Sequence, residues 1–172
     1  MPKTLSDAKT KFTVLTTKPA DPEKPTLTEL NAGIQAECHV LSSDFVFTAN
    51  ASETLDEKEL CVAGNAQALG VANHQCEFSP FRYYAQGTSK PDDTDDVLFA
   101  AVKVRGSELW CYGRKGDKPG KAAWEAEEEI YMGAKIITDT PQQTDLTGYQ
   151  KVKIVGLIQE AWDYIEVAAG TP

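Results

Sequence analysis

Hydrophobic and polar residues alternate along much of this chain with the two-residue period of strands that bury one face. The pattern predicts strands over Lys11–Thr16, Ile34–Val40 and Leu109–Arg114, and a further strand in which Phe45 and Phe47 share a face. Most of the ordered chain is therefore expected to be β-structure.

Three more predicted strands are longer than the five or six residues of an average strand. They cover Val71–Tyr84, Ile130–Thr138 and Tyr149–Glu160. Long strands with partly apolar faces present polar surface and unpaired edges to their surroundings. Such edges are a liability in a monomer and useful in an assembly, so the pattern favours a subunit that contacts copies of itself.

A short capped turn is predicted after a loop that contains Pro19, Pro22 and Pro25. Its sequence, Thr-Leu-Thr-Glu-Leu-Asn-Ala-Gly from Thr26 to Gly33, has the spacing of a capping box, in which a Thr and a Glu three residues later cap one turn reciprocally. The prediction is a single helical turn that leads into the next strand.

One longer helix is predicted at about residues 92–105. Asp92 or Asp93 can cap its first turn, where the positive end of the helix dipole favours acidic side chains. Gly106 suits the left-handed residue that commonly follows a helix. The apolar stripe that would pack this helix against the sheet consists of Val97, Leu98, Ala101, Val102 and Val104.

The predicted elements are joined in two places by long connections, which cover Ala49–Gly70 and Lys115–Glu128. Loops of this length in a compact protein are commonly functional or disordered. The second carries Trp124, which either packs locally or meets a partner. The overall prediction is a mainly β (α+β) protein with an N-terminal arm, long loops and one flanking helix, folded as a single domain over residues 1–172.

Composition narrows the classes of function. The chain has 172 residues and a formal net charge of −9, which weighs against binding nucleic acid by neutralising phosphates. No apolar stretch approaches the roughly 20 residues that span a bilayer, so no membrane partner is expected. The polar N-terminus lacks the apolar core of a signal peptide, which indicates a protein made in the cytoplasm.

No catalytic or metal-binding constellation is present. His39 and His74 both lie in alternating strand-like sequence, and no Gly-x-Ser-x-Gly elbow, phosphate loop or dinucleotide fingerprint occurs. The acidic run Asp92–Asp96 lacks the spacing of a calcium loop. We therefore predict no enzyme activity, no cofactor and no metal. The widely spaced thiols are expected to behave as small buried hydrophobes; they are Cys38, Cys61, Cys76 and Cys111.

The order of the motifs resembles a known family over nearly the whole chain, from about Pro2 to Ile165. The family is the major tail protein, or tail tube protein, of long-tailed siphophages that infect actinobacteria. The motifs that carry the resemblance are Thr26–Gly33, Gly64-Asn65-Ala66-Gln67-Ala68-Leu69-Gly70, Phe81-Arg82-Tyr83-Tyr84, Leu98-Phe99-Ala100-Ala101-Val102-Lys103, Leu109-Trp110-Cys111-Tyr112-Gly113-Arg114 and Ile136-Ile137-Thr138-Asp139-Thr140-Pro141-Gln142.

This resemblance implies two packed antiparallel sheets, sandwich-like or barrel-like, with the helix on the flank. It also implies hexameric rings that stack into a hollow tube in the virion tail, through which DNA passes. The implied partners are other copies of the chain, a tape measure protein, and tail initiator and terminator proteins. The N-terminal arm and Ala49–Gly70 could reach neighbouring rings. No C-terminal immunoglobulin-like domain, which some tail tube proteins carry, is expected.

An acidic lumen would repel phosphates and keep DNA from sticking in transit. Alternation along the predicted strands offers Glu77 and Glu128 as lumen-facing acids. Two other tube or binding functions stay open, namely a type VI secretion-like tube protein and a monomeric β-sandwich binding module. The binding module would use an exposed patch of Trp110, Tyr112 and Trp124. A hydrolase that uses unpaired carboxylates is a further alternative.

Overall fold

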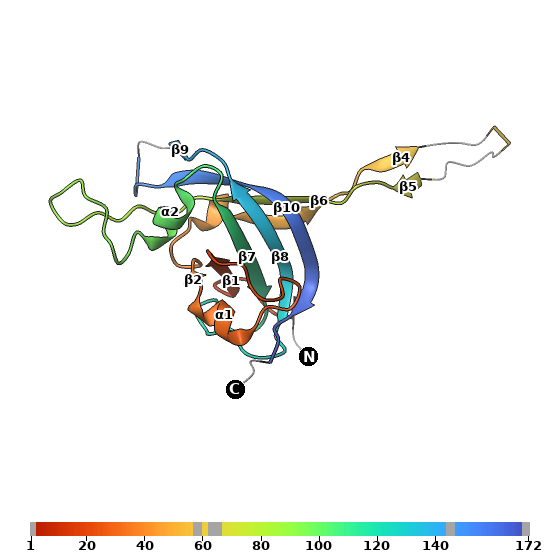
Figure 1. Ribbon diagram of the computed structural model, residues 1–172, viewed down its shortest axis with the longest axis horizontal. Helices are drawn as coiled ribbons and strands as arrows, with labels where there is room; N and C mark the ends of the chain where they lie inside the picture. The colour runs from red at the N-terminus through yellow and green to blue at the C-terminus, as the bar shows by residue number, and fades with distance from the viewer. Residues whose placement is uncertain (1–2, 57–59, 62–66, 144–146, 170–172) are drawn as a thin grey trace.

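The computed structural model describes residues 3–56, 60–61, 67–143 and 147–169, and one antiparallel sheet dominates it (Figure 1). Its strands lie in the order β2-β1-β7-β8-β10-β6-β3, and β9 pairs with the start of β10. The mainly β prediction is confirmed. The strands of this sheet are β1 (Thr10–Leu15), β2 (Ile34–Gln35), β3 (Val46–Asn50), β6 (Asn73–Phe78), β7 (Glu108–Lys115), β8 (Glu129–Thr138), β9 (Gln142–Gln143) and β10 (Val152–Glu166).

The expected pair of packed sheets is replaced by one eight-stranded sheet that curls around its own core. Phe12 on β1 contacts Phe47 on β3 and Phe78 on β6, with ring centroids 5.3 and 5.4 Å apart, although these strands lie near opposite ends of the strand order. A strongly twisted sheet can bury its apolar face against itself and needs no second sheet. The outer strands β2 and β3 do not pair with each other, so the sheet does not close.

Strand β7 shows how both faces of the sheet are used. Leu109 and Cys111 point into the curled interior, whereas Trp110 and Tyr112 point to the other face and join a second buried cluster. Successive side chains of a strand alternate between faces, so one strand supports both clusters. The second cluster also contains Leu30 of helix α1 (Leu27–Ala32), which covers this end of the outer face.

The capping box predicted for α1 is confirmed. The backbone N–H of Glu29 donates to Thr26 Oγ1 over 3.3 Å, and the N–H of Thr26 donates to Glu29 Oε2 over 2.8 Å. Burial acts to raise the pKa of Glu29, but the hydrogen bonds from the N–H groups of Ala20 and Thr26 outweigh it and lower that pKa. The single turn is therefore held at its start by its own side chains.

The second helix, α2 (Val97–Val102), is shorter than the predicted helix at residues 92–105. The aspartates that precede it are engaged elsewhere. Asp92 Oδ1 accepts hydrogen bonds from the N–H groups of Thr94 and Asp95, which makes a turn and lowers the pKa of Asp92. Asp96 occupies the N-cap position without a capping hydrogen bond, so the prediction that Asp92 or Asp93 caps the helix was wrong.

Several predicted strands differ from the observed ones at the ends where the chain leaves the sheet. Only Ile34–Gln35 of the predicted strand Ile34–Val40 is a strand, and the predicted strand Val71–Tyr84 contracts to β6. Strand β10 starts later than predicted and runs to Glu166, 15 residues in all. The connection Ala49–Gly70 is not simply a loop, because it contains β4 (Thr54–Asp56) paired with β5 (Gln67–Leu69).

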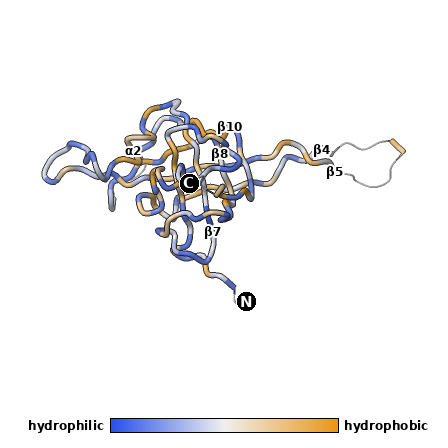
Figure 2. The backbone as a smooth tube through the Cα atoms, turned by 60° about the horizontal axis from the view of Figure 1, so that its bottom comes forward, coloured by the Kyte–Doolittle hydropathy of each residue, from blue (hydrophilic) through white to orange (hydrophobic). Residues whose placement is uncertain are grey.

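The β4–β5 hairpin, defined here as the described residues 51–56, 60–61 and 67–71, projects from one side of the body as a narrow ribbon (Figure 1). Figure 2 shows apolar segments along this ribbon, well outside the two buried clusters. At the opposite end of the long axis lies the segment between β6 and α2. In the part of the chain that is described, no helix is long and apolar enough to cross a membrane.

Candidate assembly surfaces

The longest strand, β10, has an open edge. Strand β8 pairs along it from Gly156 to Glu166, whereas on the other side β6 reaches only from Ile154 to Gly156. From Leu157 onward no described strand pairs with that side, because β6 turns away into the hairpin. The unpaired N–H and C=O groups of such an edge are a template for a strand from another chain.

The side chains along this edge fit an interface. Leu157 is 51% exposed and Tyr164 is 75% exposed, although both are large and apolar or aromatic. Tyr164 also has a φ of +53°, which a bulky residue rarely adopts. On either side of Tyr164, Asp163 pairs with Met132 of the first buried cluster and Ile165 pairs with Ile130 of the second. Strain of this kind is often found at functional positions.

The β4–β5 hairpin is a second candidate surface. Its exposed apolar side chains are Leu55, Leu60, Leu69 and Val71. Leu69 pairs with Thr54, and beyond this pair both Gly70 and Val71 hydrogen-bond to the backbone of Glu53, so a bulge ends the regular ladder. A two-stranded ribbon without a core is at best marginally stable in water. The ribbon therefore exposes apolar surface that a partner could bury.

The base of the hairpin is tied firmly to the body. Strands β3 and β6 pair from Val46 to Asn50, and His74 Nε2 lies 2.9 Å from Asp163 Oδ2 on β10. His74 thus links the root of the hairpin to the strand with the open edge. His39 instead packs edge-on against Tyr83.

The N-terminal arm lies on the loop between β7 and β8. The N–H of Gly120 donates to the carbonyl of Ala8 over 2.7 Å, and Lys9 forms an ion pair with Asp117. Farther toward the start of the chain, Leu5 is 75% exposed. The arm is therefore anchored from Ala8 onward and offers an exposed apolar side chain before that point.

The aromatic residues proposed for a binding module are buried. The exposed fractions of Trp110, Tyr112 and Trp124 are 6%, 0% and 2%, so the prediction that they form an exposed aromatic patch was wrong. Trp124 packs locally, where its indole N–H donates to Thr13 Oγ1 over 2.9 Å and its backbone N–H donates to Asn31 over 3.0 Å. These bonds fix the loop between β7 and β8 against α1 and β1.

Glu128, one of the two acids predicted to face a lumen, lies within a network of cations. Its Oε2 accepts from Arg114 over 2.8 Å, and its Oε1 accepts from Lys118 over 2.8 Å. Burial acts to raise the pKa of Glu128, but the bonds from Lys118, the Glu125 N–H and Arg114 outweigh it, and the pKa is lowered. This carboxylate braces the loop that carries Trp124.

Glu77, the other predicted lumen acid, lies on β6. Lys153 on the neighbouring strand β10 approaches its Oε2 to 2.6 Å, and Gln75 donates to its Oε1 over 3.0 Å. The hydrogen bond from Lys153, followed by that from Gln75, lowers the pKa of Glu77. Glu77 is therefore ionised at neutral pH and partly neutralised by its partner.

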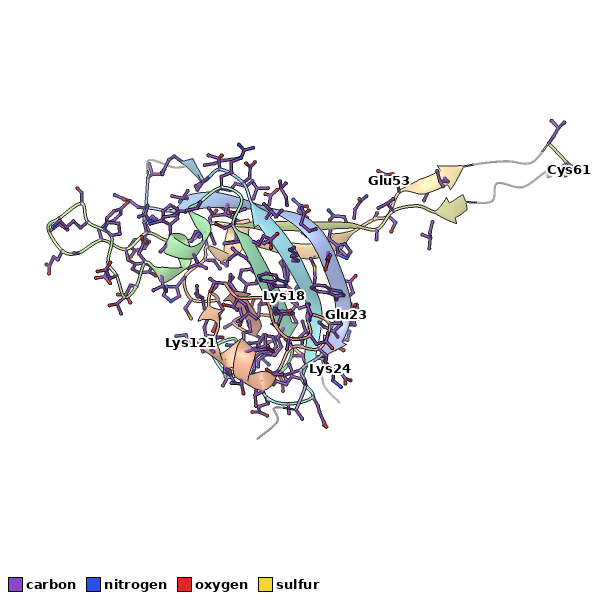
Figure 3. The ribbon with its side chains drawn as sticks, in the orientation of Figure 1. Lys18, Glu23, Lys24, Glu53, Cys61 and Lys121 are labelled. Atoms are coloured by element: carbon purple, nitrogen blue, oxygen red, sulfur yellow. The ribbon has the colours of Figure 1, made fainter. Side chains whose placement is uncertain are left out.

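The thiols divide into two kinds. Cys76 and Cys111 are buried as predicted, whereas Cys38 and Cys61 are exposed. Cys38 follows β2, where the predicted strand does not continue, and Cys61 lies toward the tip of the hairpin (Figure 3). Burial raises the pKa of the Cys111 thiol, and the neighbouring Cys76 adds to this shift. Among the described residues no group of three metal-ligating side chains occurs.

An open strand edge and a projecting hairpin fit a subunit that contacts other chains. A family model described as phage tail tube protein matches residues 1–171. The chain belongs to this family. The tail tube protein is thus a structural protein of the virion tail, and self-association follows from the family in general terms. A search of curated proteins finds no match.

Sequence reasoning recognised the tail tube protein by the order of its motifs but not by its surfaces. Leu157 fell within a predicted strand, and the unusual length of that strand was the available signal for an open edge. Leu69 and Val71 were assigned to a loop and the start of a strand, so their exposure was missed. No observation in the structure favours a type VI secretion-like tube protein over the phage family that is matched.

Proposed function

We propose that this tail tube protein assembles into hexameric rings that stack into the hollow tail of a siphophage infecting an actinobacterium, and that genomic DNA passes through this tube. Its partners would be other copies of the chain, a tape measure protein, and tail initiator and terminator proteins. The open edge of β10 from Leu157 to Glu166 carries the ring proposal.

An edge of this length requires a cover. Proteins commonly protect edges with short strands, inward charges, bulges or covering elements. Here the strand is 15 residues long and has a bulge between Ile158 and Glu160, yet Leu157 and Tyr164 on it stay exposed. Addition of a strand from a neighbouring copy would pair the open groups, and a closed ring of copies would leave no free edge around its circumference.

The charge of the molecule suits a passage for DNA. We propose Glu77 and Glu128 as lumen-facing acids, supported by the net charge of −9. Each is paired with a cation, so each contributes a locally balanced rather than a strongly negative surface. Glu160 and Glu166 on β10 are exposed and have no ion pair among the described residues, so they supply unbalanced negative charge beside the edge. A surface of this kind would not retain phosphates.

Negative-stain electron microscopy tests the assembly. Purified protein, first dilute and then concentrated, and with initiator proteins added, should form rings or hollow tubes wide enough for a DNA duplex. Leu157→Lys should prevent assembly while the monomer keeps its unfolding midpoint, because it places a charge on the exposed edge. Val104→Lys is the matched control, since Val104 is 60% exposed and follows α2 instead of lying on β10. Monomers under all conditions would overturn the proposal.

A further inference from the structure

We propose that Cys76 and Cys111 form a modification site, at which oxidation joins their two sulfurs in a disulfide that closes the curled sheet covalently. Both thiols are free, and their exposed fractions are 1% and 0%. Cys76 lies on β6 and Cys111 on β7, two strands that β10 and β8 separate in the sheet. The site belongs to the folded subunit, so it exists whether or not copies assemble.

The curl of the sheet brings the strands of the two thiols together. Along these strands, Cys111 pairs with Val14 on β1, and Cys76 pairs with Phe47 on β3. The ring of Phe12, two residues before Val14, packs edge-on against the ring of Phe47, with centroids 5.3 Å apart. The interior side chains of β1 and β7 therefore face those of β3 and β6 across the buried cluster. At this level the thiol of Cys76 is close enough to hydrogen-bond with that of Cys111.

Small residues occupy the intervening strands at the positions paired with the two thiols. Strand β8 carries Ala134 beside Cys111, and strand β10 carries Gly156 beside Cys76. Ala134 in turn pairs with Ala161 on β10. A Cβ atom at Gly156 would lie only 3.1 Å from Cys76 Sγ, so this sulfur already fills part of the space over β10. Strands β8 and β10 curve around the interior (Figure 1), and no bulky side chain stands between the thiols at these paired positions.

The reaction needs an oxidant, and hydrogen peroxide is a small one. One thiol attacks the peroxide, the O–O bond breaks, and a sulfenic acid forms with release of one water. The other thiol then attacks the sulfenic sulfur, the S–S bond forms, and a second water leaves. The two thiols together lose two protons and two electrons, and the peroxide accepts both. Because disulfides form on virions and are rare in the cytosol, we expect the pair to be reduced during synthesis and oxidised in released particles.

Burial makes this reaction slow. It raises the pKa of the Cys111 thiol, and the reactive form of a cysteine is the thiolate. The oxidant gains access when the sheet opens locally, which is possible because its outer strands β2 and β3 do not pair with each other. We therefore expect the exposed thiol of Cys38 to react first and the buried pair to follow more slowly.

Peptide mapping of the purified chain tests the site. In a background with Cys38→Ser and Cys61→Ser, the folded protein is treated with dilute hydrogen peroxide, then denatured in an alkylating reagent and digested. We expect a joined peptide pair that links Cys76 to Cys111 within one chain and carries two hydrogens fewer than the reduced pair. The matched control keeps Cys38 and Cys111, through Cys61→Ser and Cys76→Ala, and should give no joined pair within one chain. Thiols that all remain alkylatable, sulfinic acids without a joined pair, or a disulfide only between two chains would each overturn the site.

Thermal unfolding tests whether the disulfide closes the sheet. The oxidised protein should unfold about 5–15 °C above the reduced protein, because a cross-link between β6 and β7 restricts the unfolded chain. Peroxide-treated Cys111→Ala in the same background should show no such rise. A joined pair with an unchanged or lower midpoint would overturn the closing role of the disulfide.

Released tail particles, purified without reductant, show whether the modification occurs in the virion. After denaturation in an alkylating reagent, we expect the same joined peptide pair between Cys76 and Cys111. Particles in which both thiols are alkylated would overturn the modification and leave the proposed tube function intact. Failure of the chain to form tubes would instead reject the proposed function and leave the mapping of the purified chain unaffected.

Discussion

At the scale of single residues, Trp124 shows how one side chain can hold a long loop. It is 2% exposed, and its indole N–H donates to Thr13, which is itself fully buried. Trp124→Phe keeps an aromatic ring but removes the donor and part of the volume. We expect a loss of about 1–3 kcal/mol in the free energy of unfolding, from an unpaired hydroxyl and a small cavity.

Urea denaturation checks this expectation. Tyr149→Phe serves as the control, because the Tyr149 side chain is exposed and no described hydrogen bond uses its hydroxyl. Equal urea midpoints for wild type and Trp124→Phe would show that the indole bond contributes nothing.

Glu128 gives a second prediction at this scale. Glu128→Gln leaves the nearly buried guanidinium of Arg114 without its counter-charge, which we expect to cost roughly 3 kcal/mol in the free energy of unfolding. Glu77→Gln should cost less than 1 kcal/mol, since the side chains of Glu77 and Lys153 are 24% and 34% exposed. Thermal or urea unfolding of the two variants compares the largely buried Glu128–Arg114 pair with the partly exposed Glu77–Lys153 pair. Equal losses in the free energy of unfolding would contradict the expected difference.

The pH dependence of stability follows from the same carboxylate. The pKa of Glu128 is lowered in the folded protein, so the folded state binds fewer protons than the unfolded state near that pKa. The contribution of Glu128 is therefore complete above its unfolded pKa of about 4.3 and is lost as the pH falls through the lower folded value. The difference in stability between wild type and Glu128→Gln should shrink below about pH 4; a constant difference from pH 3 to pH 7 would contradict this assignment.

At the scale of elements, we expect the β4–β5 hairpin to be needed for assembly but not for folding. None of its described residues belongs to either buried cluster. Replacing residues 51–72 by Asn-Gly would join Asn50 to Asn73, which already pair across β3 and β6, through a favoured two-residue turn. We expect the shortened chain to fold with a similar unfolding midpoint and to form no tubes. Circular dichroism and electron microscopy provide the two measurements, and normal tubes from this variant would exclude a role of the hairpin in assembly.

The elements also show what sequence could and could not predict. The capping box at Thr26 and Glu29 and the strand over Ile130–Thr138 were predictable, because local side-chain bonds and strict alternation determine them. Helix α2 was predicted too long because Asp96 is engaged by Arg82, a contact 14 residues away that no local rule contains. The single curled sheet could not be distinguished from two packed sheets, since both bury alternate residues. The open edge of β10 could not be predicted from the sequence either, because it depends on where β6 stops pairing with β10.

At the scale of the whole molecule, charge opposes the association of copies that each carry −9. The repulsion is long-ranged at low salt, where the Debye length is about 30 Å at 0.01 M, and is screened at about 8 Å in 0.15 M salt. Assembly should therefore require a lower protein concentration at 0.15 M than at 0.01 M salt, as measured by sedimentation. Tubes held together mainly by ion pairs between copies would show the opposite trend.

The passage of DNA gives the last prediction, because it depends on the charge that the assembled surface presents. If Glu77 faces the lumen, Glu77→Gln exposes the charge of Lys153, and a ring of such lysines would retain phosphates and slow DNA ejection. The double variant Glu77→Gln with Lys153→Gln removes both charges and should eject DNA at nearly the wild-type rate. Particles carrying each variant tail can be compared by the rate of DNA release at two salt concentrations. Slow release by the single variant, relieved by salt and by the second substitution, would place the Glu77–Lys153 pair beside the DNA. Equal release by all three tails would place it on another surface of the tube.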